Sequence, residues 1–228
     1  MAYTYPTFVT ALASEMAVDP SNADFLTILP TLIDTAEQLC YRELDLLAAL
    51  VTVTATASAN NRLLTLPTGS GHLLVVDSVA AIDAGGTRHM MVPATRETID
   101  FLYPTNTASF SPSYPSIFAR YDDLTLIYGP PPDSGYTVEI VSTIRPAALT
   151  AVNTATYLSQ YLPDLFLAAA MVSAMGWMKN FGAQSDDPKS SVSWQNEYNV
   201  RLASAQKEER RKQYVAAMSS PPVSQKDV

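Results

Sequence analysis

The sequence is poor in charge, in cysteine and in histidine. Charged residues make up 16% of the 228 residues, whereas soluble domains carry about 25%. A surface with few charges is often covered by partners, so the composition favours a component of an assembly. The single cysteine, Cys40, excludes an internal disulfide. The two histidines, His72 and His89, have no cysteine or histidine neighbours at the spacing of zinc ligands.

Long apolar runs and glycine-rich catalytic motifs are also missing. The longest apolar stretch, residues 165–178, is shorter than the roughly 20 residues of a membrane span. Gly69-Ser70-Gly71 lacks the frame of a nucleophile elbow, and Gly85-Gly86 lacks the further glycines of a dinucleotide site. We therefore predict no catalytic, cofactor-binding or metal-binding residues, and no cofactor.

The charge that is present is acidic and uneven. The formal net charge is −8 and the pI is about 4.6, which argues against general nucleic-acid binding. Residues 1–185 hold 7 Lys/Arg and 16 Asp/Glu, whereas residues 186–228 hold 7 and 6. The C-terminal part is therefore the place where an acidic partner surface would find cations.

The most informative stretch is residues 24–48, where apolar side chains recur every three or four residues. This spacing predicts a regular helix from about Pro30 to Leu47, with a looser turn from Asp24 because proline suits only a first turn. Cys40 lies on the apolar stripe and is expected to be a buried free thiol. The opposite face is expected to be solvated or interfacial, with Glu37, Glu43 and Asp45. A shorter helix is expected over residues 5–17.

After Leu50 the pattern changes to the alternation of β-strands. Residues 50–56 are expected to pair with residues 62–66 across a turn at Asn60-Asn61. Residues 72–82 are expected to form a hairpin with residues 87–92, and a short helix should follow. That short helix is expected at 96–103, and further strands are expected at 116–121, 124–129 and 136–144, with a hairpin turn at Asp122-Asp123.

Helical spacing returns after Thr154. One turn is expected at 157–162, and Pro163 opens a helix that is apolar on all sides and runs through Lys179. Asp186-Asp187-Pro188 predicts the start of a last helix that runs to about Met218. Its apolar face ends near Ala205, so we expect residues 206–213, QKEERRKQ, not to be held by the core of this chain. The apolar face is expected to comprise Val192, Trp194, Tyr198, Leu202 and Ala205.

Residues 29–48, LPTLIDTAEQLCYRELDLLA, resemble the signature helix of bacteriophage head-to-tail adaptor proteins, also called connector or head completion proteins. The similarity continues through LTLP at 63–66 and the strand pairs RYDDLTLIYGPPP and YTVEIVSTIRPAAL. It then reaches YLPDLFLAAAMVSAMGWMKN, in which Leu162 is inserted into the family's Tyr-Pro-Asp-Leu. The order of these short motifs covers nearly the whole chain.

The resemblance implies a structural virion protein at the head-tail junction, assembled in the host cytoplasm, and not an enzyme. Such a protein would bind the portal ring after genome packaging, assemble as a dodecameric ring and provide the platform for tail attachment. The implied partners are the portal protein, a nozzle or tail-completion protein and further copies of this chain. No membrane and no sequence-specific nucleic acid are implied, although packaged DNA passes through such a ring.

The expected fold is α+β: a helical bundle of two N-terminal and two C-terminal helices, a β-rich insert and an extended C-terminal tail. The expected domains are 1–49 for the N-terminal helices, 50–146 for the β-rich insert, 147–218 for the C-terminal helices and 219–228 for the tail. The residues expected to contact the portal are Lys207, Arg210, Arg211, Lys212, Tyr214, Pro221, Pro222 and Val223. The residues expected to make fold or ring contacts are Pro30, Ile33, Ala36, Glu37, Tyr41, Arg42, Leu44 and Asp45.

Two other classes of function stay open. A carbohydrate- or receptor-binding virion protein is suggested by the β-rich insert and by the aromatic residues Tyr103, Phe110 and Tyr114. A cell-wall-degrading glycoside hydrolase would need a pair of acid and base carboxylates. Asp122 and Asp123 are adjacent, and adjacent strand residues point to opposite faces, so a hairpin turn explains them better.

Overall fold

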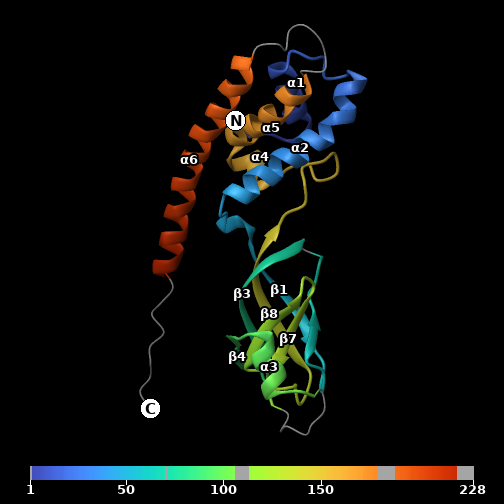
Figure 1. Ribbon diagram of the computed structural model, residues 1–228, viewed down its shortest axis with the longest axis vertical. Helices are drawn as coiled ribbons and strands as arrows, with labels where there is room; N and C mark the ends of the chain where they lie inside the picture. The colour runs from blue at the N-terminus through green and yellow to red at the C-terminus, as the bar shows by residue number, and fades with distance from the viewer. Residues whose placement is uncertain (1, 70, 106–112, 179–187, 220–228) are drawn as a thin grey trace. The chain divides into compact units, whose positions relative to one another are not determined.

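A computed structural model describes residues 2–69, 71–105, 113–178 and 188–219. Within these residues the fold is α+β, with six α-helices and two four-stranded sheets. Contacts separate two units (Figure 1): Met1–Ala48 with Ala147–Val228, which we call the helical unit, and Ala49–Pro146, which we call the β unit. The chain therefore leaves the helical unit once and returns to it once.

The helical unit is arranged around α5, which contacts α1, α2, α4 and α6. Eight residues of α5 are buried, among them Phe166 and Met171, and they are all apolar. Phe166 stacks on Phe8 of α1 with ring centroids 4.3 Å apart. The helices of this unit are α1 (Tyr5–Glu15), α2 (Ala23–Glu43), α4 (Tyr157–Tyr161), α5 (Pro163–Met178) and α6 (Pro188–Ser219), and the 3-10 helix η1 (Leu47–Ala49) follows α2.

Helix α2 is longer at its start and shorter at its end than the sequence predicted. It begins at Ala23 because the Asn22 side chain accepts hydrogen bonds from the N–H groups of Asp24 and Phe25. Pro30 lies inside the helix on its exposed side, where water can reach the carbonyl that proline leaves unpaired. The helix ends at Glu43, since Leu44 has an extended backbone. The expected bounds, Pro30 to Leu47, are therefore wrong.

Other predictions for the helical unit have mixed outcomes. The free thiol of Cys40 is buried, as expected, and its burial raises the pKa to about 12. Helix α1 ends at Glu15 and not at residue 17, because the backbone of Ala17 takes a positive φ of 52° that a helix cannot contain. The expected end of the apolar helix at Lys179 and the tail beyond Ser219 lie outside the described residues.

The β unit contains two sheets and one helix. The first sheet has the strand order β1-β8-β3-β4, and the second has the order β2-β7-β6-β5. Its elements are β1 (Leu50–Ala57), β2 (Leu63–Thr65), β3 (His72–Ile82), β4 (Arg88–Met90), β5 (Val92–Pro93), α3 (Arg96–Leu102), β6 (Ile117–Asp122), β7 (Thr125–Gly129) and β8 (Tyr136–Arg145).

Two of the three predicted hairpins are confirmed. Strand β3 pairs with β4, and β6 pairs with β7 across the turn at Asp122-Asp123. The third prediction, that residues 50–56 pair with 62–66, is wrong. Strand β1 pairs instead with β8 over its full length, and β2 pairs with β7 in the other sheet. The chain does turn at Asn60, but the turn carries it from one sheet to the other.

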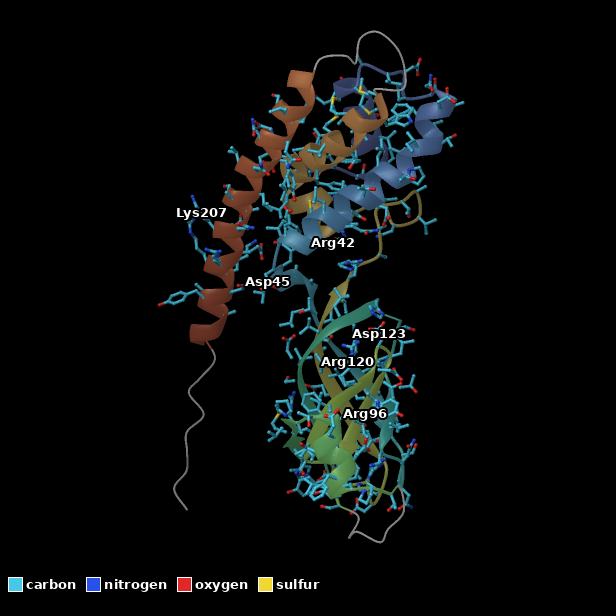
Figure 2. The ribbon with its side chains drawn as sticks, viewed as in Figure 1. Arg42, Asp45, Arg96, Arg120, Asp123 and Lys207 are labelled. Carbon is cyan, nitrogen blue, oxygen red and sulfur yellow. The ribbon has the colours of Figure 1, made fainter. Side chains whose placement is uncertain are left out.

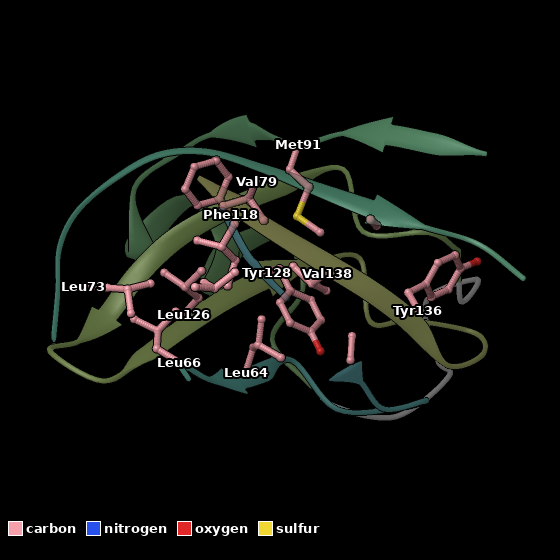
Figure 3. Packing of buried hydrophobic residues seen from close by; sticks show 14 of the residues in the cluster. Leu64, Leu66, Leu73, Val79, Met91, Phe118, Leu126, Tyr128, Tyr136 and Val138 are labelled. Carbon is pink, nitrogen blue, oxygen red and sulfur yellow. The ribbon is translucent and has the colours of Figure 1, made fainter. Parts of the chain in front are cut away.

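Residues from both sheets form one apolar core, which Figure 3 shows from close by. Along β8 the buried positions alternate, so Tyr136, Val138 and Ile140 face the core. Phe118, Leu126 and Tyr128 contribute from the second sheet. The alternation of residue character along 136–144 in the sequence therefore indicates a strand with one face against this core.

Arg120 connects the two sheets at their rim. Its guanidinium donates to the carbonyls of Leu73 and Leu74 on β3, at 2.8 and 3.0 Å, and to the carbonyl of Asp123 at 2.6 Å. His72 lies 3.1 Å from the carboxylate of Asp123. Figure 2 labels Arg120 and Asp123. The turn at Asp122-Asp123 is thus a structural element, held by cation-to-carbonyl contacts.

Candidate interaction site at the end of helix α6

The described residues hold neither a cluster of metal-ligating side chains nor a membrane-spanning helix. They contain no group of three His, Cys, Asp or Glu side chains arranged to hold a metal ion. None of the helices in the described ranges is both long and apolar enough to cross a membrane. The carboxylate of Asp122 accepts the N–H of Leu124 at 2.8 Å, which is the role of a turn residue.

The aromatic residues that suggested a carbohydrate surface contact other parts of the β unit. The ring of Tyr114 stacks on His89 with centroids 4.2 Å apart, and His89 pairs with Asp83 at 3.2 Å. The carbonyl of Tyr103 accepts a hydrogen bond from Arg62. Phe110 lies outside the described residues. The Tyr103 side chain packs against the small cluster of Ile99, Ala119 and Ile127, whereas Tyr114 remains 44% exposed beside His89.

Helix α6 changes character along its length. In its first half and just beyond, Tyr198 and Ala205 are buried, and Trp194 and Leu202 are half-buried, in line with the expected apolar face. Val192 was expected on that face but is 60% exposed. The hydroxyl of Tyr198 donates to Glu43 at 2.6 Å, and burial together with this bond raises the pKa of Tyr198.

The part of α6 beyond Ala205 buries no apolar side chain between residues 206 and 216, as expected, but polar contacts hold it to the rest of the helical unit. Glu209 is only 2% exposed. Its carboxylate accepts the N–H of Leu47 at 3.2 Å, the hydroxyl of Tyr157 at 3.2 Å and the ammonium of Lys212 at 2.7 Å. Glu209 continues the stripe of Tyr198, Leu202 and Ala205, and this helical spacing was a signal in the sequence for its inward position.

Two glutamines of the same part of α6 bind the end of α2. Gln206 donates to the carbonyl of Glu43 at 3.1 Å, and Gln213 donates to the carbonyl of Asp45 at 2.7 Å. The last carbonyls of a helix have no partner within the helix, so side chains from elsewhere must satisfy them. An open pocket of about 180 Å³ lies at this junction. It is lined by Glu43, Asp45, Gln206, Glu209, Arg210 and Gln213.

The predicted portal-contact residues divide into three groups. Lys207, Arg210 and Arg211 are exposed, and Tyr214 is 65% exposed. Figure 2 shows Lys207 on the side of α6 that is turned away from Asp45. Lys212 instead turns inward, where burial lowers its pKa but hydrogen bonds to Glu208, Glu209 and Tyr157 outweigh burial and raise it. The remaining three, Pro221, Pro222 and Val223, lie outside the described residues.

The residues predicted for fold or ring contacts also divide. Ile33, Ala36 and Leu44 are buried, Tyr41 is half-buried, and Pro30, Arg42 and Asp45 are exposed. Arg42 donates to the side chain of Gln38 at 3.0 Å. The buried ones serve the fold of the helical unit, and the exposed ones are open to solvent in this structure.

Glu37 was expected on a solvated or interfacial face, and this is wrong. Its side chain is 3% exposed, and both carboxylate oxygens accept the N–H of Leu149, at 3.1 and 3.3 Å. Burial raises the pKa of Glu37 to about 7, although the hydrogen bonds from Leu149 and Thr156 oppose the shift. Asp34, one turn earlier, is exposed.

Comparison with protein families decides the class of the molecule. Residues 3–224 match the family model described as SU10 adaptor protein. The chain belongs to the SU10 adaptor family. This is a phage head-tail adaptor family, which is structural rather than catalytic. By family, the adaptor is therefore a structural protein of the virion. The search of curated proteins gives no match.

Proposed function

We propose that this adaptor binds the portal ring at the head-tail junction after genome packaging and provides the platform on which the tail is attached. The family match over residues 3–224 is the observation that carries the proposal. Family membership supports a role among head and tail proteins, and the exposed charges of the helical unit support our choice of the surface for the portal.

The surface we assign to the portal is the outward face of α6 beyond Ala205. It presents Lys207 and Arg211, with Tyr214 beside them, and Arg210 lies at its edge, where it also lines the pocket at the end of α2. The net charge of the chain is −8. None of the described contacts uses these three cations in ion pairs with their own chain. A concentrated basic face on an acidic protein favours an acidic partner surface and steers its approach. We propose that Pro221, Pro222 and Val223 extend the same contact, because proline-containing segments lose little entropy on binding.

We further propose that copies of the adaptor assemble as a dodecameric ring beneath the portal, with the exposed Pro30, Arg42 and Asp45 at contacts between copies. Few surface charges favour faces that other chains cover, which supports the proposal. The ring would be formed on the portal as a template, with the tail protein binding below and packaged DNA passing through.

The test replaces Arg210 and Arg211 with glutamine and measures binding to portal rings by sedimentation at several salt concentrations. We expect affinity to fall at least about tenfold and its salt dependence to weaken, because each lost cation removes one charge pair across the interface. The matched control carries Ser193→Asp and Asn196→Asp. It changes the net charge by the same amount at exposed positions in the first half of α6.

Retained affinity and salt dependence in the Arg210→Gln/Arg211→Gln variant would reject this surface. Equal weakening in the control would show that only the total charge matters. Loss of portal binding by the unmodified adaptor under all conditions would reject the proposed function itself.

A further inference from the structure

The chain crosses between its two units twice, and a buried glutamate holds each crossing. On the way out, between α2 and β1, the N–H of Leu47 donates to Glu209 at 3.2 Å. On the way back, between β8 and α4, the N–H of Leu149 donates to Glu37 at 3.1 Å. The two carboxylates are 2% and 3% exposed, respectively. A buried carboxylate is costly unless it is hydrogen-bonded, so each one demands its backbone partner.

The surroundings of the two glutamates differ. Glu37 lies in the middle of α2 between the buried Ile33 and Cys40, and Leu149 itself is 1% exposed. The return connection is also internally bonded, since the side-chain amide of Asn153 donates to the carbonyls of Ala147 and Ala148, at 2.9 Å in both cases. Moving this anchor would require unpacking the apolar core of the helical unit.

Glu209 lies in a segment of α6 that buries no apolar side chain of its own between residues 206 and 216. Between residues 206 and 216 it is the one buried side chain in the described structure, and Tyr214 and Val215 are both more than 60% exposed. The open pocket beside it is lined by Glu43, Asp45 and polar groups of α6. Water can replace polar contacts at such a site, whereas it cannot replace apolar packing.

We propose that Glu37 is a fixed anchor and Glu209 a releasable one, and that docking of the portal at the end of α6 detaches Glu209 from Leu47 and so loosens the connection into β1. This inference rests on the proposed function, because it takes the outward face of α6 as the docking surface. It adds a consequence of docking: a partner on α6 changes the segment that leads into the β unit.

The coupling follows from the geometry of one helix. Arg210 is the direct neighbour of Glu209, and Lys207 and Arg211 lie within one helical turn of it. A helix moves as a rigid element over so short a length, so a partner that pulls these cations outward also moves the Glu209 carboxylate. Lys212 bonds to both Glu208 and Glu209. Lys212 can keep its ion pair with Glu208 when the Glu209 carboxylate loses its hydrogen bonds to the Tyr157 hydroxyl and the Leu47 N–H.

The first experiment measures hydrogen exchange by mass spectrometry in the full chain. Glu209→Ala is expected to speed exchange in the peptide covering 44–49 by about tenfold and to leave the peptide covering 147–153 unchanged. Glu37→Ala is expected to do the reverse. The control is Glu208→Ala, which removes an exposed partner of Lys212 but no contact to either connection; it should change neither peptide. The assignment of anchors is overturned if either variant speeds exchange equally in both peptides. It is also overturned if neither variant speeds exchange in either peptide.

The second experiment uses the unmodified adaptor and the portal ring of the same phage as the probe, so it does not depend on whether a variant folds. Portal binding is expected to speed exchange in 44–49 several-fold while 147–153 keeps its protection. Binding with unchanged or increased protection at 44–49 overturns the release of Glu209 and leaves the proposed function intact. Absence of binding rejects the proposed function and the release step that depends on it. The hydrogen exchange of the Glu209→Ala and Glu37→Ala variants still tests which glutamate holds which connection.

Discussion

Helix α5 and the end of α6 belong to the same unit, but contacts of opposite kinds hold them. The buried residues of α5 are all apolar. Residues 206–216 of α6 bury only Glu209 within the described structure. Gln206 and Gln213 bind the carbonyls of Glu43 and Asp45. Glu209 and Lys212 bind the hydroxyl of Tyr157 in α4, and Glu209 also accepts the N–H of Leu47. Apolar packing cannot be exchanged for water without large cost, whereas polar contacts can. The difference marks α5 as framework and the end of α6 as the part that a partner can engage.

The largest effect is expected where the framework is disrupted. Leu32→Asp puts a carboxylate at a position that is 3% exposed, and no cation faces the buried stripe of α2 in the described contacts. An unpaired buried charge of this kind costs more than about 4 kcal/mol, which a domain of this size cannot lose. We expect no cooperative thermal transition by circular dichroism. The control, Thr31→Asp, adds the same charge at the exposed neighbouring position and should melt within a few degrees of the unmodified protein.

A Leu32→Asp protein that melts cooperatively at near-native temperature would show that α2 is not part of the framework. It would also remove the contrast with α6, because both regions would then tolerate polar substitution.

A smaller, pH-dependent effect is expected at Glu37. Burial raises its pKa in the folded protein to about 7, from an ordinary value of 4.5. The folded state therefore binds this proton more tightly than the unfolded state does. Its contribution to the free energy of unfolding is complete below about pH 4.5 and is lost as the pH rises through about 7. The full loss is about 3 kcal/mol.

Urea unfolding at pH 5 and pH 7.5 measures this contribution. Glu37→Gln keeps an oxygen to accept the Leu149 N–H but has no proton to lose, so its stability should vary less between the two pH values. Asp34→Asn removes an exposed carboxylate one turn away, whose charge is the smallest of the causes that shift the pKa of Glu37, and should keep most of the pH dependence of the unmodified protein. Identical pH dependence in all three proteins would mean that Glu37 does not titrate in this range.

Sequence patterns predicted the elements better than their partners. The apolar spacing of α2 and α5 and the turn residues of the β3–β4 and β6–β7 hairpins are local signals, and the structure contains all four elements. The partner of β1 is β8, more than about 80 positions away along the chain, and no local turn can indicate it. The prediction began the regular helix at Pro30 because of the proline and did not use Asn22, which caps the helix that begins at Ala23.

The two buried glutamates could not be predicted for a related reason. A glutamate on a helix is usually solvated, and only a partner that removes its cost explains its burial. For Glu37 that partner is the N–H of Leu149, 112 positions away, and for Glu209 it is the N–H of Leu47, 162 positions away. Helical periodicity shows which face of the helix a residue occupies. It does not show that a backbone N–H from a distant part of the chain lies against that face. Lys207, Arg210 and Arg211 are exposed and need no such partner. The charge pattern of the sequence was therefore enough to select them as candidate contact residues.

Removing residues 214–228 is expected to have the smallest effect on stability. The same truncation is expected to have the largest effect on attachment. The described side chains in this segment are exposed or half-exposed, including Tyr214 at 65% and Val215 at 64%. The contacts of Gln206, Glu209 and Gln213 to the end of α2 and the residues after it all remain. We expect the free energy of unfolding to change by less than about 0.5 kcal/mol, and attachment to portal-bearing heads to be abolished.

A chain ending at Ala205 is the comparison for this truncation. It also loses the contacts of Gln206, Glu209 and Gln213, exposes the end of α2 and should be less stable by about 2 kcal/mol in urea unfolding. If the chain ending at Gln213 still attaches at full strength, the docking surface lies before residue 214 and the removed segment plays no part in it. If the two truncations are equally stable, the polar contacts at the end of α6 contribute nothing, and the contrast with α5 then rests on packing alone.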